Sequence, residues 1–266
     1  MIIAQISDPH IPVPGKKTYA IAPMAENLVM TVNHINNLNP QPDVALITGD
    51  ITANARMDEA EQAAKILGKL NMPFFIVPGN HDDRASLRSV FGVAFPVTEH
   101  EPMNFLVADY DIRLIGLDTS VVGAPGGRIS AASALWLDKT LAEEQTKPTA
   151  LFMHHPPVKL GVLETDVDGF EGSELLAAVI SKYSNIECLL CGHIHLPTAV
   201  KWHGTIVTTA PSIGMELVLD LTLKQASSFI LATPGYQLHY WTPQNNLVSH
   251  TRYVKQDATQ YFFEDN

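Results

Sequence analysis

Residues 2–10 read Ile2-Ile3-Ala4-Gln5-Ile6-Ser7-Asp8-Pro9-His10, a short apolar run that ends in an acid, a proline and a histidine. Short runs of this kind, rich in β-branched residues, are typical of strands buried on both faces of a sheet. Two later runs end in the same way, because 44–48 is followed by Gly49-Asp50 and 74–77 by Pro78-Gly79-Asn80-His81. Each predicted strand therefore stops at side chains that can bind a metal ion or a proton.

Segments of helical period separate these strands. In the range 21–38, Ile21, Ala25, Leu28, Val32 and Ile35 recur at spacings of three and four, which predicts a helix with one apolar face. Alternation of strands and helices predicts an α/β fold with helices covering a sheet. The same reading predicts further helices at 57–70, 131–144 and 173–182, and further strands at 105–108, 112–117, 150–153 and 186–190. From about Lys201 the predicted strands are 205–209, 228–232, 237–241 and 247–254, a mostly antiparallel segment without long helices.

The 266 residues are few enough for one hydrophobic core, so we expect one domain over 1–266, with 210–266 as a candidate small cap or oligomer contact. We also expect a homo-oligomer, a dimer or larger. The formal net charge of -11 argues against long DNA or RNA as a partner, because such binding needs clustered Lys and Arg.

No apolar stretch approaches the roughly 20 residues of a membrane helix, and the first residues carry no basic leader. Only Cys188 and Cys191 are present, too few for a disulfide framework. These observations predict a cytoplasmic protein without a membrane partner. In an apolar strand the two thiols point to opposite faces, so we interpret them as packed core residues and not as half of a zinc site.

Two more strand ends carry histidines. His154-His155 follows 150–153, and Gly192-His193-Ile194-His195 follows 186–190. In open α/β sheets ligands bind beyond the carboxyl ends of the strands, so all five strand ends point to one site. The candidate metal ligands are Asp8, His10, Asp50, Asn80, His154, His193 and His195.

Seven ligands exceed what one ion normally accepts, and a carboxylate such as Asp50 can bridge two cations. The sequence therefore predicts a binuclear centre. Oxygen and imidazole donors without thiolate favour two divalent or mixed-valence ions from the set Fe, Mn, Zn and Co.

The five strand-end motifs, in this order, resemble the signature of the calcineurin-like metallophosphoesterase family. The segments 1–8, Pro78-Gly79-Asn80-His81-Asp82-Asp83 and 152–157 are most similar to bacterial glycerophosphodiesterases and class III cyclic-nucleotide phosphodiesterases. The resemblance implies a four-layer α/β/β/α sandwich. It also implies that Asp8, His10 and His195 hold one ion, that Asn80, His154 and His193 hold the other, and that Asp50 bridges them.

The expected chemistry is in-line attack on a phosphate ester by a hydroxide that the two ions hold. His81 is the candidate to bond a phosphoryl oxygen or assist the leaving group, and with Asp50 and Asn80 it completes the set of residues named catalytic. A helix-start residue bonding the backbone is the alternative for His81. The resemblance also has a gap, because the loop at Gly214-Met215-Glu216 lacks a histidine that some relatives carry there.

The roles of several residues next to the candidate ligands are open to two interpretations. His155 either reaches the substrate pocket or fills space, and Asp82 and Asp83 are read as caps of the helix that follows them. Asn54, Arg56 and Arg84 can bind phosphate oxygens, although a solvated charge is the simpler account of Arg84 alone.

The predicted function is a phosphodiesterase for a small diester, either a 3′,5′-cyclic nucleotide such as cyclic AMP or a glycerophosphodiester. A broad phosphomonoesterase and a non-catalytic binding scaffold of the same fold are the alternatives, and the seven ligands argue against the scaffold. A DNA-processing nuclease lacks the basic groove it would need.

Overall fold

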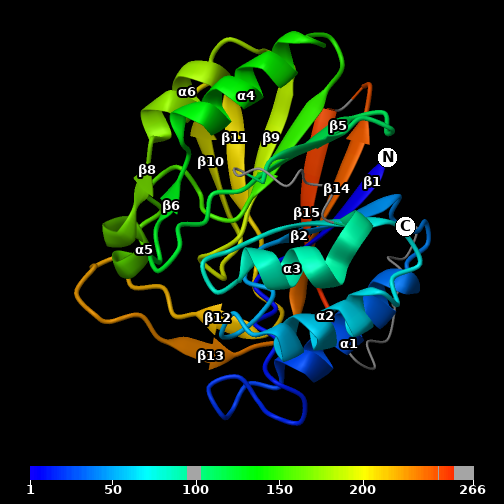
Figure 1. Cartoon of the computed structure of the whole chain (residues 1–266), viewed down its shortest axis with the longest axis vertical. Coiled ribbons are helices and arrows are strands. Elements are labelled where there is room, and N and C mark those ends of the chain that lie inside the picture. The colour runs from blue at the N-terminus through cyan, green and yellow to red at the C-terminus, as the bar shows by residue number, and fades with distance from the viewer. Residues whose placement is uncertain (95–102, 245, 255–266) are drawn as a thin grey trace, which may run out of the picture.

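The computed structural model describes residues 1–94, 103–244 and 246–254, and its two large sheets face each other (Figure 1). The first sheet has the strand order β15 (Asn246–Tyr253), β14 (Gly235–Thr242), β1 (Ile2–Ile6), β2 (Val44–Thr48) and β3 (Phe74–Val77). The second has the order β10 (Thr198–Trp202), β11 (Thr205–Thr209), β9 (Ile186–Cys191), β7 (Thr149–Met153), β5 (Arg113–Leu117) and β4 (Phe105–Val107).

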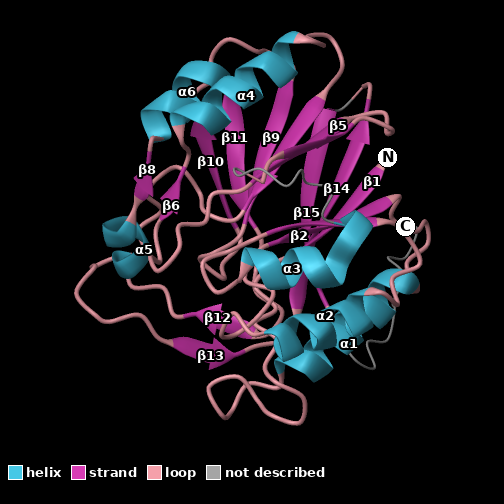
Figure 2. Ribbon diagram, in the orientation of Figure 1, coloured by secondary structure: helices cyan, strands magenta, loops and turns pink. Residues whose placement is uncertain are grey.

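Helices cover the outer face of each sheet (Figure 2). The first sheet packs against α1 (Met24–Asn36), α2 (Met57–Leu67) and α3 (Arg84–Phe91), and the second against α4 (Ala131–Ala142) and α6 (Ser173–Ile180). The shorter elements are η1 (Gly92–Ala94), β6 (Gly127–Arg128), α5 (Leu163–Asp168), β8 (Phe170–Glu171), β12 (Met215–Leu217) and β13 (Phe229–Leu231). This arrangement confirms the predicted four-layer α/β/β/α sandwich with mixed sheets.

Alternation along the strands divides the interior into two cores. On β7, Phe152 packs between the two sheets, whereas Leu151 and Met153 point outward beneath α4 and α6. On β9, Cys188 belongs to the core between the sheets and Cys191 to the core under the helices. Both thiols are free and buried, as predicted, and burial raises the pKa of Cys188 to about 12.

The C-terminal hairpin is part of the first sheet. β14 pairs antiparallel with β1, with Ile2 opposite Tyr240, and β15 pairs antiparallel with β14. β12 and β13 form a separate two-stranded sheet, whose exposed apolar side chains include Ile230 and Leu231. The cap or oligomer contact predicted within 210–266 stays a prediction, as does the homo-oligomer. Residues 255–266 lie outside the described residues.

Other differences from the predicted elements have local causes. β10 and β12 were not predicted, because β10 is an edge strand with alternate side chains exposed and β12 has only three residues. The first helix starts at Met24, later than predicted, because Pro23 occupies its N-cap position. No helix in the described ranges is both long and apolar enough to cross a membrane.

The buried imidazole of His239, on β14, makes stability depend on pH. Burial, helped by the nearby His250, lowers its pKa from 6.5 to about 3. Between these two values the unfolded chain binds a proton that the folded chain does not. We therefore expect the free energy of unfolding to fall as pH drops from 6.5 toward 3, by up to about 1.4 kcal/mol per pH unit from this residue.

Urea unfolding of the wild type and of His239→Gln at pH 7.5 and pH 5 measures this contribution. The difference in stability between the two proteins should shrink or reverse at pH 5, because the variant lacks the titrating ring. An identical pH dependence in both proteins would contradict the assignment.

Candidate metal centre

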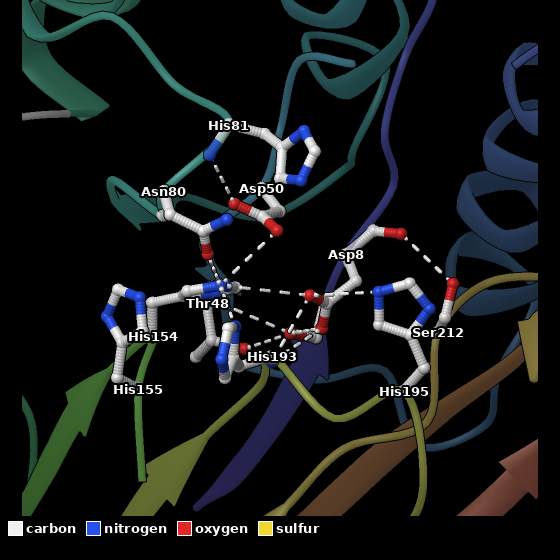
Figure 3. A network of polar contacts seen from close by, with 12 residues as sticks. Asp8, Thr48, Asp50, Asn80, His81, His154, His155, His193, His195 and Ser212 are labelled. Atoms are coloured by element: carbon white, nitrogen blue, oxygen red, sulfur yellow. Dashed lines mark hydrogen bonds and ion pairs between the residues drawn. The ribbon is translucent and has the colours of Figure 1, made fainter. Parts of the chain in front are cut away.

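Five strand ends from both sheets meet at one site, where their polar side chains point toward one another (Figure 3). Asp8 and His10 follow β1, Asp50 follows β2, and Asn80 follows β3. His154 comes directly after β7, and His193 and His195 follow β9. The structure thus brings together all seven residues that the sequence singled out.

The backbone at these strand ends is unusual. Left-handed φ values between 41° and 74° occur at five of the seven residues: Asp8, His10, Asp50, His193 and His195. This conformation is uncommon outside glycine and is held only where the surroundings determine it. Here the turns are bonded to one another, since His10 N donates to Asp50 O at 2.8 Å and Asp8 N donates to Gly49 O at 3.2 Å. The strain is concentrated where the polar side chains converge.

A first group of donor atoms surrounds His10. Its Nε2 lies 3.1 Å from His195 Nε2 and 3.5 Å from Asp50 Oδ2. His195 Nε2 lies in turn 3.5 Å from Asp8 Oδ1. Two imidazole nitrogens and two carboxylate oxygens therefore face one point.

A second group surrounds His154. Its Nε2 lies 3.2 Å from Asn80 Oδ1, 3.2 Å from His193 Nδ1 and 3.4 Å from Asp50 Oδ2. Asp50 Oδ2 takes part in both groups, so this one oxygen joins them.

The chemistry of these donors fits divalent metal ions. Ligand atoms about 2.1 Å from one ion lie roughly 3.0–3.4 Å from each other, close to the spacing observed in both groups. His154 Nδ1 lies 2.8 Å from Thr48 O, and His195 Nδ1 lies 2.8 Å from Met215 O. Because a carbonyl only accepts, each Nδ1 carries a proton, and each Nε2 is the nitrogen that can bind a metal ion. Carboxylate oxygens and imidazole nitrogens gathered in this way need a positive charge between them, either a proton or a metal ion.

The pKa shifts of Asp50 and His154 also indicate that the centre attracts positive charge. Burial would raise the pKa of Asp50, but the adjacent His154 brings it well below its usual range. Burial would likewise lower the pKa of His154, yet Asp50 and Asp8 raise it to about 9. The carboxylate of Asp50 therefore attracts positive charge to the centre, although burial raises the pKa of Asp8, and a metal ion competes there with a proton on His154.

Two glycines let the strands approach closely enough. A Cβ on Gly79 would collide with the Oδ1 atom of Asp50. A Cβ on Gly49, whose φ is +85°, would lie 2.5 Å from His154 Nδ1. Asp50 Oδ1 instead accepts the backbone N–H of His81 at 2.8 Å, which leaves Oδ2 for the two donor groups.

His81 lies at the mouth of the site. Its Nδ1 is 2.9 Å from Ala53 O, so it donates to that carbonyl and Nε2 is left for another partner. The ring lines an open cavity of ≈ 660 Å³ together with Asn80, and other side chains of the lining include Lys16, Lys17 and Arg56. His81 is thus placed between the donor groups and a space that can admit a substrate.

Three residues next to the candidate ligands already have partners within the protein. His155 is buried and uses both ring nitrogens, with Nε2 at 3.1 Å from Pro125 O and Nδ1 at 2.9 Å from Thr119 Oγ1. It therefore supports the ring of His193, whose centroid is 4.6 Å away. Asn54 donates its side-chain amide to Glu59 at 3.0 Å, and Arg56 forms an exposed ion pair with Asp58.

Two of the predicted roles for neighbouring residues need correction. The guanidinium of Arg84 is not a solvated charge, because it donates to both carboxylate oxygens of Asp118, at 2.6 and 3.0 Å. Asp82 is not a helix cap, since it accepts the backbone N–H groups of Ile51 and Thr52 at 3.1 and 2.8 Å. Asp83 alone caps α3, accepting Ser86 N at 2.8 Å.

Several residues that support the ligands were not predicted. Met215 begins β12, in the segment that lacks the expected histidine, and its carbonyl fixes the ring of His195. Ser7 donates to Asp8 Oδ2 at 2.5 Å, and Thr48 supplies the carbonyl for His154. In the sequence, these supporting residues were indicated only by Gln5 and Thr48, two polar residues inside strands that are otherwise apolar.

Comparison with known proteins identifies the family. The model for the calcineurin-like phosphoesterases matches residues 1–197. The chain is 38% identical over 264 residues to "Probable glycerophosphodiester phosphodiesterase GpdQ" of Arcobacter nitrofigilis, covering 99% of this chain and 97% of that protein. It is 31% identical to the glycerophosphodiester phosphodiesterase GpdQ of Enterobacter lignolyticus (80% of this chain, 77% of that one). It is 25% identical to the 3′,5′-cyclic adenosine monophosphate phosphodiesterase CpdA of Escherichia coli K12 (88% and 83%).

Solved structures share the fold at low identity. A dimetal phosphatase from Danio rerio superposes with a TM-score of 0.65 at 14% identity, covering 96% of this chain and 99% of that one. The purple acid phosphatase PPD1 from yellow lupin superposes with a TM-score of 0.70 at 14% identity, covering 98% of this chain and 52% of that one. These two likenesses support the four-layer architecture alone.

Proposed function

The chain belongs to the calcineurin-like phosphoesterase family, and from that premise we propose that it hydrolyses small phosphodiesters at a centre of two divalent metal ions. One observation carries the proposal: Asp50 Oδ2 belongs to two groups of donor atoms. Within each group, neighbouring donor atoms lie 3.1–3.5 Å from one another. One ion would be held by Asp8, His10 and His195, and the other by Asn80, His154 and His193. Asp50 would contribute to both sites. The donor set suits Fe, Mn, Zn or Co.

The residues around the centre have separate tasks in the reaction. When bound, two such cations supply charge to an in-line displacement at phosphorus and activate water at neutral pH. His81 lines the cavity, Ala53 O holds its Nδ1–H, and Nε2 is the ring nitrogen that would donate to a phosphoryl oxygen or to the leaving group. Lys16 and Lys17 line the same cavity and favour an anionic substrate.

The proposed substrate is a glycerophosphodiester. Two relatives at 38% and 31% identity bear this activity in their names, whereas the relative named for cyclic AMP is 25% identical. A cyclic nucleotide is therefore the second candidate.

Rates on glycerophosphoethanolamine, cyclic AMP and p-nitrophenyl phosphate, measured on one preparation with Mn²⁺ added, test this choice. We expect the glycerophosphodiester to give the highest kcat/KM. A higher value with cyclic AMP would transfer the assignment to the second candidate, and a higher value with the monoester would make the protein a phosphomonoesterase. No turnover of any of the three by a metal-loaded protein would support the scaffold alternative.

A further inference from the structure

A line of buried polar side chains crosses the first sheet and ends on Asp8. Its inner half begins with Gln5 Nε2, which donates to Thr48 Oγ1 at 3.0 Å. Thr48 Oγ1 donates to Ser7 Oγ at 2.8 Å, and Ser7 Oγ donates to Asp8 Oδ2 at 2.5 Å. All four side chains are buried.

The outer half reaches the opposite edge of the sheet. Gln5 Oε1 lies 2.9 Å from Nε2 of His239, and His239 Nδ1 lies 2.7 Å from Ser249 Oγ on β15. Because an amide oxygen only accepts, His239 Nε2 must carry the proton, and Nδ1 must accept from the Ser249 hydroxyl. Ser249 is exposed, so the line runs from solvent through β14, β1 and β2 to the metal centre.

The direction of every hydrogen bond is fixed. The carboxylate of Asp8 only accepts, so the single proton of Ser7 is used there and Ser7 Oγ receives from Thr48. The second amide proton of Gln5 goes to Cys191 O at 2.9 Å, and rotating the amide by half a turn would set its oxygen against that carbonyl. Hydrogen bonds that all point one way in a dry interior polarise and strengthen one another.

The end of this line determines how Asp8 presents its two oxygens. Ser7 fixes Oδ2, while the backbone N–H of His193 lies 3.1 Å from each oxygen. Oδ1 is left to face His195 Nε2 at 3.5 Å. The line also explains Gly192, since a Cβ there would collide with the hydroxyl of Ser7.

We propose that the chain Ser249–His239–Gln5–Thr48–Ser7 is a one-way hydrogen-bond relay that positions the carboxylate of Asp8 for its metal ion. The inference rests on the proposed metal centre. It makes Gln5, Thr48 and Ser7 positioning residues that act through Asp8 and set the affinity of the first ion. A residue that bonds a metal ligand directly, as Ser7 bonds Asp8, typically changes metal affinity 10–100-fold.

Titration of the metal-free protein with Co²⁺ tests the relay through the visible absorption of the bound ion. Thr48→Val removes the hydroxyl, keeps the shape, and leaves Thr48 O free to hold His154. We expect the Co²⁺ site that contains Asp8 to weaken at least about 10-fold and its spectrum to change, with Thr48→Ser restoring both. Ser7→Ala removes the last donor and should weaken this site as much, and it serves in place of Thr48→Val if that variant does not fold.

Thr208→Val is the matched control, because Thr208 is a buried threonine that also receives a glutamine amide, Gln237 Nε2, at 3.3 Å. Its own hydroxyl donates to Thr198 O, away from the metal ligands. Wild-type Co²⁺ affinity in the variants of Thr48 and Ser7 would overturn the relay, as would an equal loss in Thr208→Val. A wild-type protein that binds no Co²⁺ would instead refute the proposed metal centre.

Discussion

Replacing Asp50 with asparagine is expected to lower kcat/KM by at least about 10³-fold. The change removes the one oxygen anion shared by both donor groups, which lies 3.5 Å from His10 Nε2 and 3.4 Å from His154 Nε2. Losing several kcal/mol of charge stabilisation in the transition state corresponds to about this factor. We also expect the bound metal to fall below two ions per chain, as measured by elemental analysis after gel filtration.

Asp138→Asn is the control for this charge change. Asp138 lies on α4 and pairs with Lys182 on the surface, so its loss should leave both metal content and kcat/KM at the wild-type level. If Asp50→Asn kept two ions and full activity, Asp50 would not be the bridge.

Replacing His81 with alanine is expected to lower kcat by about 10²- to 10⁴-fold, the usual contribution of a positioned proton donor. Metal content should stay at the wild-type level, because the bond from His81 to Asp50 Oδ1 comes from the backbone N–H, which alanine retains. Parallel measurements of kcat and of bound metal separate the two effects.

His203→Ala serves as the comparison, since His203 is an exposed residue between β10 and β11. It should behave as the wild type in both measurements. An unchanged kcat in His81→Ala would remove His81 from the reaction and leave it a structural role through Ala53 O.

The sequence predicted those parts of the fold that depend on local pattern. β1, β2, β3 and β7 are short, mainly apolar runs that are buried over most of their length, and their pattern and length were sufficient to find them. β10 was not predicted, because it is an edge strand in which only alternate side chains are covered. The pairing of β14 with β1 joins residues more than 230 positions apart, which no local pattern reports.

In the candidate site, too, the parts that depend on local sequence could be predicted and the parts that depend on tertiary contacts could not. The seven candidate ligands could be singled out because each lies within four residues of a strand end and has a side chain suited to a cation. The residues that hold those ligands could not, because their roles depend on tertiary contacts. Met215 acts through a carbonyl, which any residue would supply, and the amide of Gln5 reaches Asp8 only through two hydroxyl groups.

The central claim is that Asp50 joins two metal sites in one chain. Metal-free protein should be titrated with Mn²⁺ at pH 8, while bound metal and phosphodiesterase activity are measured on the same samples. We expect two Mn²⁺ per chain, with activity appearing only as the second site fills. Saturation at one ion per chain with full activity, or undiminished turnover in the presence of a chelator, would contradict it.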